Sequence, residues 1–181
     1  PDTIRNATRV IYPGVGAIRD CIGEVRNRGL DEVILEVAKS KPLLGICVGM
    51  QGLMQSSSEN GGVDCLNVFP YHVNSFNAVL GDKLDTDGKR YKVPHMGWNR
   101  VSQSKHPMWK GIEDGARFYF VHSYFVDANG CADAVGVANY GIDIAAAIAK
   151  DNIFAVQFHP EKSHTDGLQL LNNFMHWDGE S

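Results

Sequence analysis

Apolar residues follow two patterns along this chain: short continuous runs, and positions spaced three or four residues apart. Short runs bounded by glycine or proline are typical of buried strands, and the wider spacing is typical of helices with one buried face. In the first third of the chain the two patterns alternate. The predicted strands are 10–12 and 42–47, and the predicted helices are 17–28, a second helix with Asp31 as its N-cap, and 48–55.

Strand patterns dominate the rest of the chain, where β-branched and aromatic residues cluster between turn signals. Residues 56–64 are polar and contain two glycines, which predicts a loop. The run at 117–126 predicts a strand pair or a bent strand. Further strands are predicted at 68–80, 92–101 and 153–158, a hairpin at 132–140 and 144–150, and a closing helix at 167–177.

This order of elements predicts an α/β fold, with a mostly parallel sheet flanked by helices and an antiparallel insertion. No linker and no internal repeat interrupts the pattern, so we expect a single domain spanning 1–181. A chain of 181 residues is long enough to bury a core without covalent staples.

Composition and charge exclude several classes of protein. The apolar fraction of 44% is that of a globular chain, and the net charge of −4 does not favour binding driven by nucleic-acid phosphates. No run of about 18 apolar residues and no export signal is visible, so we expect a cytoplasmic protein. The four cysteines have no C-x-x-C spacing, so we expect neither a metal site nor a disulfide framework.

Cys47 departs from the expectation that a cysteine is a small buried apolar residue. It lies between Gly45 and Gly49, where a buried strand passes directly into a helix. This arrangement is typical of a nucleophile elbow, a sharp turn that lifts a reactive side chain out of a sheet. The start of the following helix should lower the thiol pKa, and the Val48 N–H could bind an oxyanion. The alternative is a structural cysteine whose glycine neighbours serve packing alone.

His159 is the best candidate for the base that such a cysteine needs. It follows the buried strand 153–158 and precedes Pro160 and Glu161. Residues two apart on an extended chain point to the same side, so Glu161 can orient the His159 ring. Both His159 and Cys47 end buried strands, at the sheet edge where α/β proteins bind ligands. The alternative for His-Pro-Glu is a turn that only ends a strand.

Two further features are weaker. Gly14 and Gly16 surround Val15 in a turn after the first strand, and a peptide flip there could present the Val15 N–H as a second oxyanion donor. Gln51 lies one helical turn after Cys47 and could contact the reacting group or only support the local network. No phosphate-binding loop is present, so no nucleotide cofactor is expected. These residues best fit hydrolytic acyl transfer through a thioester.

Five segments in order resemble the class I (triad) glutamine amidotransferases, whose fold is flavodoxin-like. They are PGVG (13–16), GICVGMQ (45–51), VPHMGWN (93–99), FVHSYFV (120–126) and AVQFHPEKS (155–163). The first, third and fourth are most similar to the glutaminase subunit of imidazole glycerol phosphate synthase, in histidine biosynthesis. The resemblance covers about 10–177 and implies hydrolysis of glutamine to glutamate and ammonia.

The resemblance also implies roles for individual residues. Cys47 would be the nucleophile, His159 the general base and then acid, Glu161 its orienting partner, and Val15 and Val48 the oxyanion donors. The residues expected around bound glutamine are Gly14, Gly16, Gln51, His122, Ser123 and Tyr124. The residues expected at the face that meets a partner subunit are Met96, Trp98, Tyr119 and Lys162.

The implied partner is a (β/α)₈-barrel cyclase subunit, which would form a heterodimer with this chain and receive its ammonia. No motif here activates an ammonia acceptor, which agrees with that division of labour. The family opens with a further strand, a turn and a helix that have no counterpart before Val10, so we expect an N-terminally truncated domain. Alternatives are the same glutaminase chemistry feeding another synthase, for example in sugar amination, a stand-alone cysteine hydrolase, and an inert binding or regulatory subunit.

Overall fold

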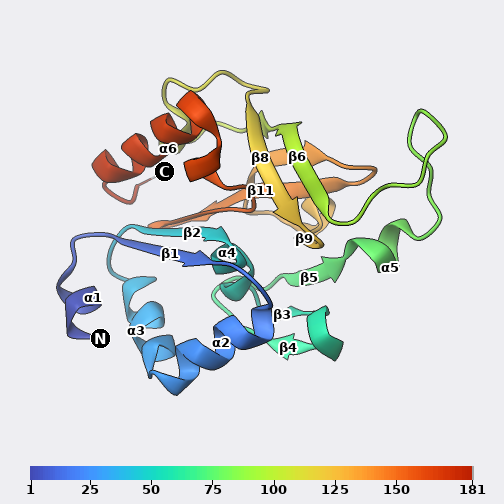
Figure 1. Ribbon diagram of the computed structural model, residues 1–181. Helices are drawn as coiled ribbons and strands as arrows, with labels where there is room; N and C mark the ends of the chain where they lie inside the picture. The colour runs from blue at the N-terminus through green and yellow to red at the C-terminus, as the bar shows by residue number, and fades with distance from the viewer. Residues whose placement is uncertain (181) are drawn as a thin grey trace.

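The centre of the molecule is a six-stranded sheet, seen in a computed structural model that describes residues 1–180. Two of its strands, β1 and β2, lie between the helices of the first third of the chain and the elements of the last third (Figure 1). The strands, in spatial order, are β1 (Val10–Gly14), β2 (Leu43–Cys47), β12 (Ile153–Val156), β11 (Asp143–Lys150), β10 (Ala134–Asn139) and β7 (Ser102–Gln103).

The α/β class is confirmed, but the sheet is mixed rather than mostly parallel. β1, β2 and β12 are parallel neighbours, whereas β12–β11, β11–β10 and β10–β7 are antiparallel. The reason lies in the connections. Only Asp151 and Asn152 separate β11 from β12, and a parallel pair needs a crossover of a dozen residues or more. The antiparallel strands are therefore part of the central sheet and not a separate insertion.

Helices cover both faces of this sheet (Figure 1). On one side lie α1 (Asp2–Asn6), α2 (Ile18–Asn27) and α3 (Leu30–Val37), and on the other lies α6 (His164–His176). The expected N-cap at Asp31 is wrong, because α3 already begins at Leu30 after Gly29. Gly29 has φ of 62°, which lets the chain turn from α2 into α3 in a single step. No helix among residues 1–180 is long and apolar enough to span a bilayer.

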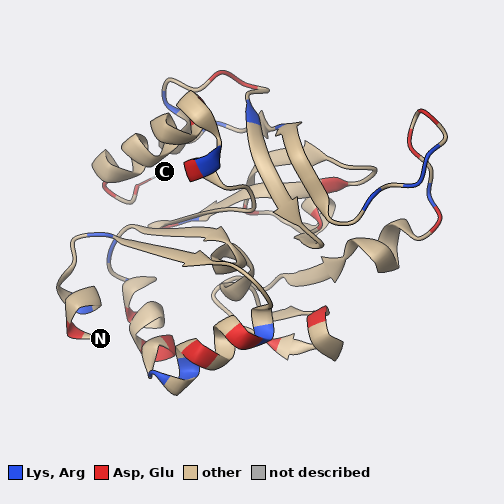
Figure 2. Cartoon of the chain, in the orientation of Figure 1, with Lys and Arg blue, Asp and Glu red and all other residues tan. Residues whose placement is uncertain are grey.

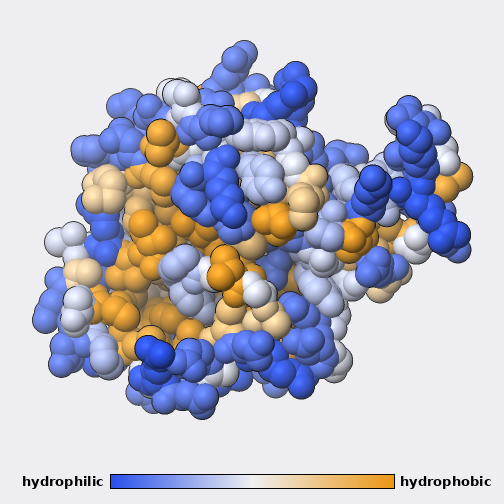
Figure 3. All heavy atoms as spheres, viewed as in Figure 1, coloured by the Kyte–Doolittle hydropathy of each residue, from blue (hydrophilic) through white to orange (hydrophobic). Residues whose placement is uncertain are grey.

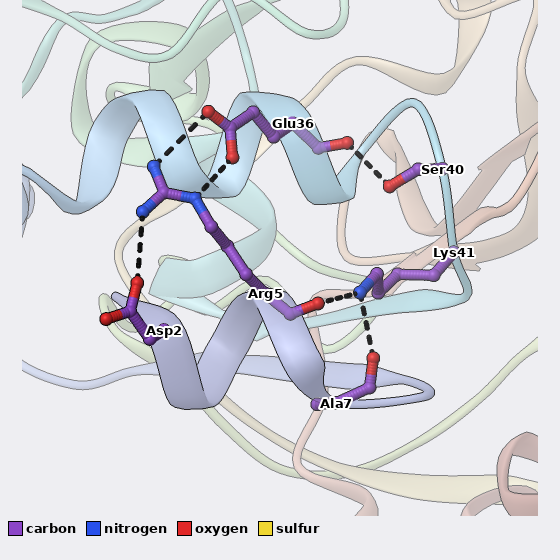
Figure 4. Close-up of polar contacts among 6 residues, drawn as sticks. All are labelled: Asp2, Arg5, Ala7, Glu36, Ser40 and Lys41. Carbon is purple, nitrogen blue, oxygen red and sulfur yellow. Dashed lines mark hydrogen bonds and ion pairs between the residues drawn. The ribbon is translucent and has the colours of Figure 1, made fainter.

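The short helix α1 is fixed to α3 by a small group of polar contacts (Figure 4). Arg5 Nε lies 2.7 Å from a carboxylate oxygen of Glu36, and this hydrogen bond lowers the pKa of Glu36. Lys41 Nζ donates to the carbonyl oxygens of Arg5 and Ala7, at 2.5 and 2.9 Å. These contacts set the direction in which the chain enters β1.

Two smaller sheets complete the fold. Where 68–80 was expected to be one strand, only His72–Ser75 is extended, and a helix follows because Phe76 and Leu80 lie one turn apart and are both buried. The expected loop at 56–64 contains two short strands and a 3₁₀ turn. The first small sheet contains β4 (Val63–Asp64), β3 (Ser56–Ser57), β5 (His72–Ser75) and β9 (Tyr124–Val126), and the second contains β6 (His95–Arg100) and β8 (Arg117–His122).

Short helices follow several of these strands. Most of them form single turns that redirect the chain between longer elements. They are α4 (Val48–Gly52), η1 (Glu59–Gly61), α5 (Phe76–Leu80), η2 (Pro107–Trp109), η3 (Ala128–Gly130) and η4 (Pro160–Lys162).

Charged residues lie mostly in loops and on outer helix faces, as Figure 2 shows for α2 and for the hairpin that projects between α5 and β6. The 3₁₀ turn η4, which precedes α6, contains one acidic residue, Glu161, and one basic residue, Lys162. Apolar surface instead gathers over β1 and β2 (Figure 3).

Candidate active site

A cavity of about 340 Å³ opens at the C-terminal ends of β1, β2 and β12. It contains most of the residues that the sequence nominated, although they come from distant segments. Gly14 and Glu161 instead line an adjoining pocket of about 310 Å³, which shares Val15 and His159 with the first. The main cavity is lined by Val15, Gly16, Cys47, Val48, Gln51, Glu59, Pro94, Val121, His122, Ser123, Tyr124, His159 and Lys162.

The predicted sharp turn at Cys47 is present. Cys47 has φ of 54° and ψ of −111°, a conformation that a residue with a side chain rarely adopts. Its glycine neighbours are required by close packing. A Cβ on Gly49 would lie 1.8 Å from the carbonyl oxygen of Tyr12, and one on Gly45 would lie 3.1 Å from the Ala155 Cβ. The turn is therefore held between two strands, and backbone strain of this kind is common at reactive positions.

The expected lowering of the thiol pKa is wrong. Burial raises the pKa of Cys47 to about 11, and the Val48 N–H and the Lys162 charge only partly oppose it. The desolvation of a thiolate in this buried position outweighs the effect of a five-residue helix. Cys47 is thus a protonated thiol at neutral pH and needs a base to become a nucleophile.

His159 and Glu161 form the expected pair. His159 Nδ1 lies 2.7 Å from Glu161 Oε1. The His159 backbone is held on both sides, because its N–H donates to Tyr119 and its carbonyl accepts from the Ser163 hydroxyl. Because Nδ1 is hydrogen-bonded to Glu161, Nε2 is the ring nitrogen available to exchange a proton with a reacting group. Among residues 1–180, no hydrogen bond joins the His159 ring to Cys47, although both line the cavity.

The turn after β1 differs from the turn at Cys47 in its exposure. Val15 is 75% exposed, and Gly16 has φ of 85° with no heavy atom near its missing Cβ. The Val15 carbonyl accepts a hydrogen bond from the Cys21 thiol at 3.2 Å. Val15 and Val48 come from different turns but line the same cavity. An oxyanion site with one donor from each turn requires this arrangement.

Gln51 belongs to a buried amide network and also lines the cavity, so its position fits both roles that the sequence allows. Its Nε2 donates to the Tyr124 carbonyl at 3.1 Å and to Gln157 Oε1 at 3.0 Å. Gln157 in turn lies with its Nε2 3.8 Å from the Cys47 sulfur. The network links the thiol to the Ser123–Tyr124 segment of the cavity wall.

Two residues of this site, Gln157 and Glu59, are not predicted from the sequence. Gln157 is fully buried, and the available signal was a single polar residue inside the apolar run 153–158. Glu59 lines the cavity from η1 and accepts a hydrogen bond from the Ile18 N–H at 3.3 Å. Burial raises the pKa of Glu59. Its only sequence signal was a carboxylate in a polar segment after the Cys47 helix.

The four residues expected at a partner face lie near the cavity on three elements, β6, β8 and η4. Met96 and Trp98 project from β6 with 62% and 43% of their surface exposed, and Tyr119 lies opposite Trp98 on β8. The Trp98 ring stacks on His164 at 4.8 Å between centroids. Lys162 lines the cavity itself. Exposed aromatic and methionine side chains beside a cavity are typical of an interface.

Comparison with known proteins agrees with the α/β fold. The chain belongs to the class I glutamine amidotransferase family. The family model, described as Glutamine amidotransferase class-I, matches residues 3–177.

Individual relatives narrow this class. The chain is 57% identical, over 177 residues, to imidazole glycerol phosphate synthase subunit HisH of Pseudomonas syringae pv. syringae, covering 97% of this chain and 82% of that protein. It is 48% identical to the protein of the same name from Acinetobacter baylyi, covering 98% and 83%. A solved glutamine amidotransferase shares the fold with a TM-score of 0.68 at 18% identity, over 97% of this chain and 81% of that one.

Proposed function

We propose that this chain is the glutaminase subunit of an imidazole glycerol phosphate synthase and hydrolyses glutamine to glutamate and ammonia. The observation that carries the proposal is the cavity shared by Cys47, with its strained backbone, and the His159 ring that Glu161 orients. The family membership and the names of the relatives agree with it.

The chemistry follows from the protonation states. His159 Nε2 takes the proton of the Cys47 thiol as the sulfur attacks the glutamine amide carbon, and the carbonyl oxygen becomes an oxyanion. The N–H groups of Val15 and Val48 stabilise this charge. Collapse breaks the C–N bond, and His159 returns the proton to the departing nitrogen, which leaves as ammonia. Water then adds to the thioester with the same proton transfers, releasing glutamate and the thiol.

Substrate recognition uses the remaining wall of the cavity. Glu59 presents a carboxylate there, which is the partner that the α-ammonium group of glutamine requires. Gly14 and Gly16 shape the turn on one side, and His122, Ser123 and Tyr124 form the opposite wall. The volume of about 340 Å³ suits one small amino acid rather than a peptide.

The product ammonia goes to a second subunit, which we propose is a (β/α)₈-barrel cyclase that forms a heterodimer with this chain. The exposed Met96 and Trp98, with Tyr119 and Lys162 beside them, provide the docking face. Docking at this face would reach the cavity directly, because Lys162, Pro94 and Val121 line it. The turn at Val15 would then complete the oxyanion site by a peptide flip.

The test is glutamine hydrolysis by the chain reconstituted with the cyclase subunit of a close relative and its nucleotide ligand. Cys47→Ala should lower ammonia release by about 10³-fold or more, because the nucleophile is lost. Cys65→Ala is the matched control, since Cys65 is also a buried thiol with its pKa raised to about 11 but does not line the cavity. Persistent stimulated hydrolysis in Cys47→Ala contradicts the proposal.

Two measurements separate the alternatives. Transfer of ammonia into the cyclase product, rather than into an aminated sugar, distinguishes this synthase from another amidotransferase. Covalent labelling of Cys47 by an electrophilic glutamine analogue tests for an inert subunit. A folded chain that remains unlabelled would have a scaffold without a working site.

A further inference from the structure

Behind the cavity wall, two buried histidines are joined ring to ring. His95 Nδ1 lies 2.8 Å from His122 Nε2, and both side chains are buried. His95 does not line the cavity, and no step of the proposed chemistry uses it. We propose that His95 is a positioning residue for glutamine hydrolysis, which fixes His122 in one tautomer and thereby holds the Tyr124 carbonyl. This inference rests on the proposed function of the cavity.

The hydrogen bond at the Tyr124 end of the pair determines which histidine nitrogen donates and which accepts. His122 Nδ1 lies 2.8 Å from the Tyr124 carbonyl oxygen, which can only accept, so Nδ1 carries the proton. In a neutral ring Nε2 must then accept, and His95 Nδ1 must donate to it. Burial lowers the pKa of His122 to about 3 and that of His95 to about 4, so both rings are neutral at physiological pH.

The opposite end agrees independently. With Nδ1 protonated, His95 Nε2 accepts, and the amide nitrogen of Asn99 lies 3.3 Å from it. The Asn99 amide cannot turn over freely, because its oxygen accepts from the Arg100 N–H and its nitrogen also donates to the Asn139 carbonyl, both at 2.8 Å. Every bond in the chain from Asn99 to Tyr124 therefore runs in the same direction.

Aromatic packing holds the His95 ring in place. It stacks between Phe120 and Tyr140, at centroid distances of 4.8 and 4.1 Å and interplanar angles of 26° and 24°. Phe76 meets the His122 ring at 5.2 Å and 61°. A donor held in this way is pre-organised, and it discriminates between the two tautomers of His122.

The chain reaches the reacting sulfur through Tyr124. The Tyr124 carbonyl accepts from both His122 Nδ1 and Gln51 Nε2. Gln51 also orients Gln157, whose amide nitrogen faces the Cys47 sulfur at 3.8 Å. If His122 adopted the other tautomer, a ring lone pair would face the Tyr124 carbonyl and this contact would become repulsive. The Ser123–Tyr124 wall of the glutamine cavity would then lose one of its two supports.

The test compares two replacements of His95, by asparagine and by leucine, in the reconstituted complex. The two new side chains have similar shapes. An asparagine amide nitrogen mimics the position of Nδ1, so His95→Asn keeps the donor to His122, whereas His95→Leu removes it. We expect His95→Leu to lower kcat/KM for glutamine by about tenfold, the scale of one lost hydrogen bond, and His95→Asn to recover most of that loss. Imidazole ¹⁵N shifts should report a single Nδ1–H tautomer of His122 in the wild type and in His95→Asn, and a mixture in His95→Leu.

A second variant covers the case in which His95→Leu does not fold. Asn99→Asp, at a half-buried position, keeps the side-chain shape but replaces the donor to His95 with an acceptor. His95 must then protonate Nε2, which removes the donor from Nδ1 unless the ring becomes charged. We expect the same tautomer mixture at His122 and a smaller loss of kcat/KM.

Either of two results overturns the proposal. The first is an unchanged His122 tautomer in folded His95→Leu, or in an Asn99→Asp variant whose ¹⁵N shifts show a neutral His95 ring. The second is an equal loss of kcat/KM in His95→Asn and His95→Leu. Failure of the proposed function is distinguishable, because the wild type would then release no ammonia while its ¹⁵N spectrum would still report the chain of hydrogen bonds.

Discussion

Two glycine-containing turns border the cavity, and they use glycine for opposite reasons. Beside Cys47, glycine is needed because there is no room for a side chain: a Cβ on Gly49 would overlap the Tyr12 carbonyl oxygen. After β1, Gly16 lies in open space and is needed only for its φ of 85°. Gly14 belongs to the first kind, because its Cβ would lie 2.9 Å from the Gly49 nitrogen.

The difference indicates how the two halves of the proposed oxyanion site can have different mobility. Cys47 and the Val48 N–H are held by close packing against the neighbouring strands, because a Cβ on Gly49 or Gly45 would find no room. The Val15–Gly16 segment is exposed and meets no packing obstacle at Gly16, and the Cys21 thiol is the hydrogen-bond donor to its Val15 carbonyl, so a docking subunit can reorient it at small cost. Substitutions at individual glycines test this difference between the two turns.

The largest effect is expected for Gly49→Ala. The new Cβ would lie 1.8 Å from a backbone atom of β1, so β1 and α4 must separate. We expect a loss of about 3 kcal/mol or more in the free energy of unfolding, measured by denaturant titration. Gly23→Ala is the control, since nothing lies within 4 Å and the residue is helical, and it should stabilise by about 0.5–1 kcal/mol. Equal stability of the two variants would contradict the packing argument.

A smaller effect on stability is expected for Gly16→Ala, which meets no clash. Alanine at positive φ costs about 1–2 kcal/mol, and Gly88→Ala, with φ of 73° in the projecting hairpin, should cost the same. Glutamine hydrolysis distinguishes the pair. It should fall about tenfold or more in Gly16→Ala, because an oxyanion donor is misplaced, and stay near wild type in Gly88→Ala. If hydrolysis falls equally in both, the turn has no special role.

The smallest effect at neutral pH concerns the thiols. Burial raises the pKa of Cys47, Cys65 and Cys131 from the ordinary value of 9.0 to about 11. The folded state therefore binds these protons more tightly than the unfolded state. The resulting stability is fully present below pH 9 and is lost as the pH rises towards 11. Unfolding titrations between pH 7 and 11 should show this decline, and a Cys65→Ala, Cys131→Ala double variant should reduce it.

Alkylation of Cys47 by iodoacetamide offers a sharper measurement of the same raised pKa. In the free chain its rate should still be rising above pH 9, because the thiolate is the reacting species. A plateau near pH 7 would show that the locked turn already holds a thiolate.

Local patterns predicted most elements and the reactive pair, because strand ends and glycine turns are encoded within a few residues. The Cys47 turn and the His159–Glu161 contact are both of this kind. Tertiary arrangement determined what the sequence analysis missed. Glu59 reaches the cavity, and Gln157 reaches the Cys47 sulfur, only once β2, β12 and η1 are assembled. The thiol pKa depends on a burial that no local pattern contains.

The expectation of a mostly parallel sheet was wrong for a related reason. The residues of β11 and β12 predict strands correctly, but their direction depends on the two-residue connection at 151–152. A one-turn helix at Phe76 was likewise hidden among strand-forming neighbours. Pairing partners and short turns follow from packing rather than from the pattern of a single segment.

The apolar surface over β1 has a consequence for the behaviour of these residues in solution. Among residues 1–180, β1 pairs with β2 alone, so its other edge leaves backbone groups free, and Ile11 and Val15 add exposed apolar side chains. An open, apolar strand edge recruits further strands. This free edge of β1 favours association with other chains unless something covers it. In a preparation where the edge is exposed, we expect aggregation to reduce the amount of usable protein before loss of catalysis does.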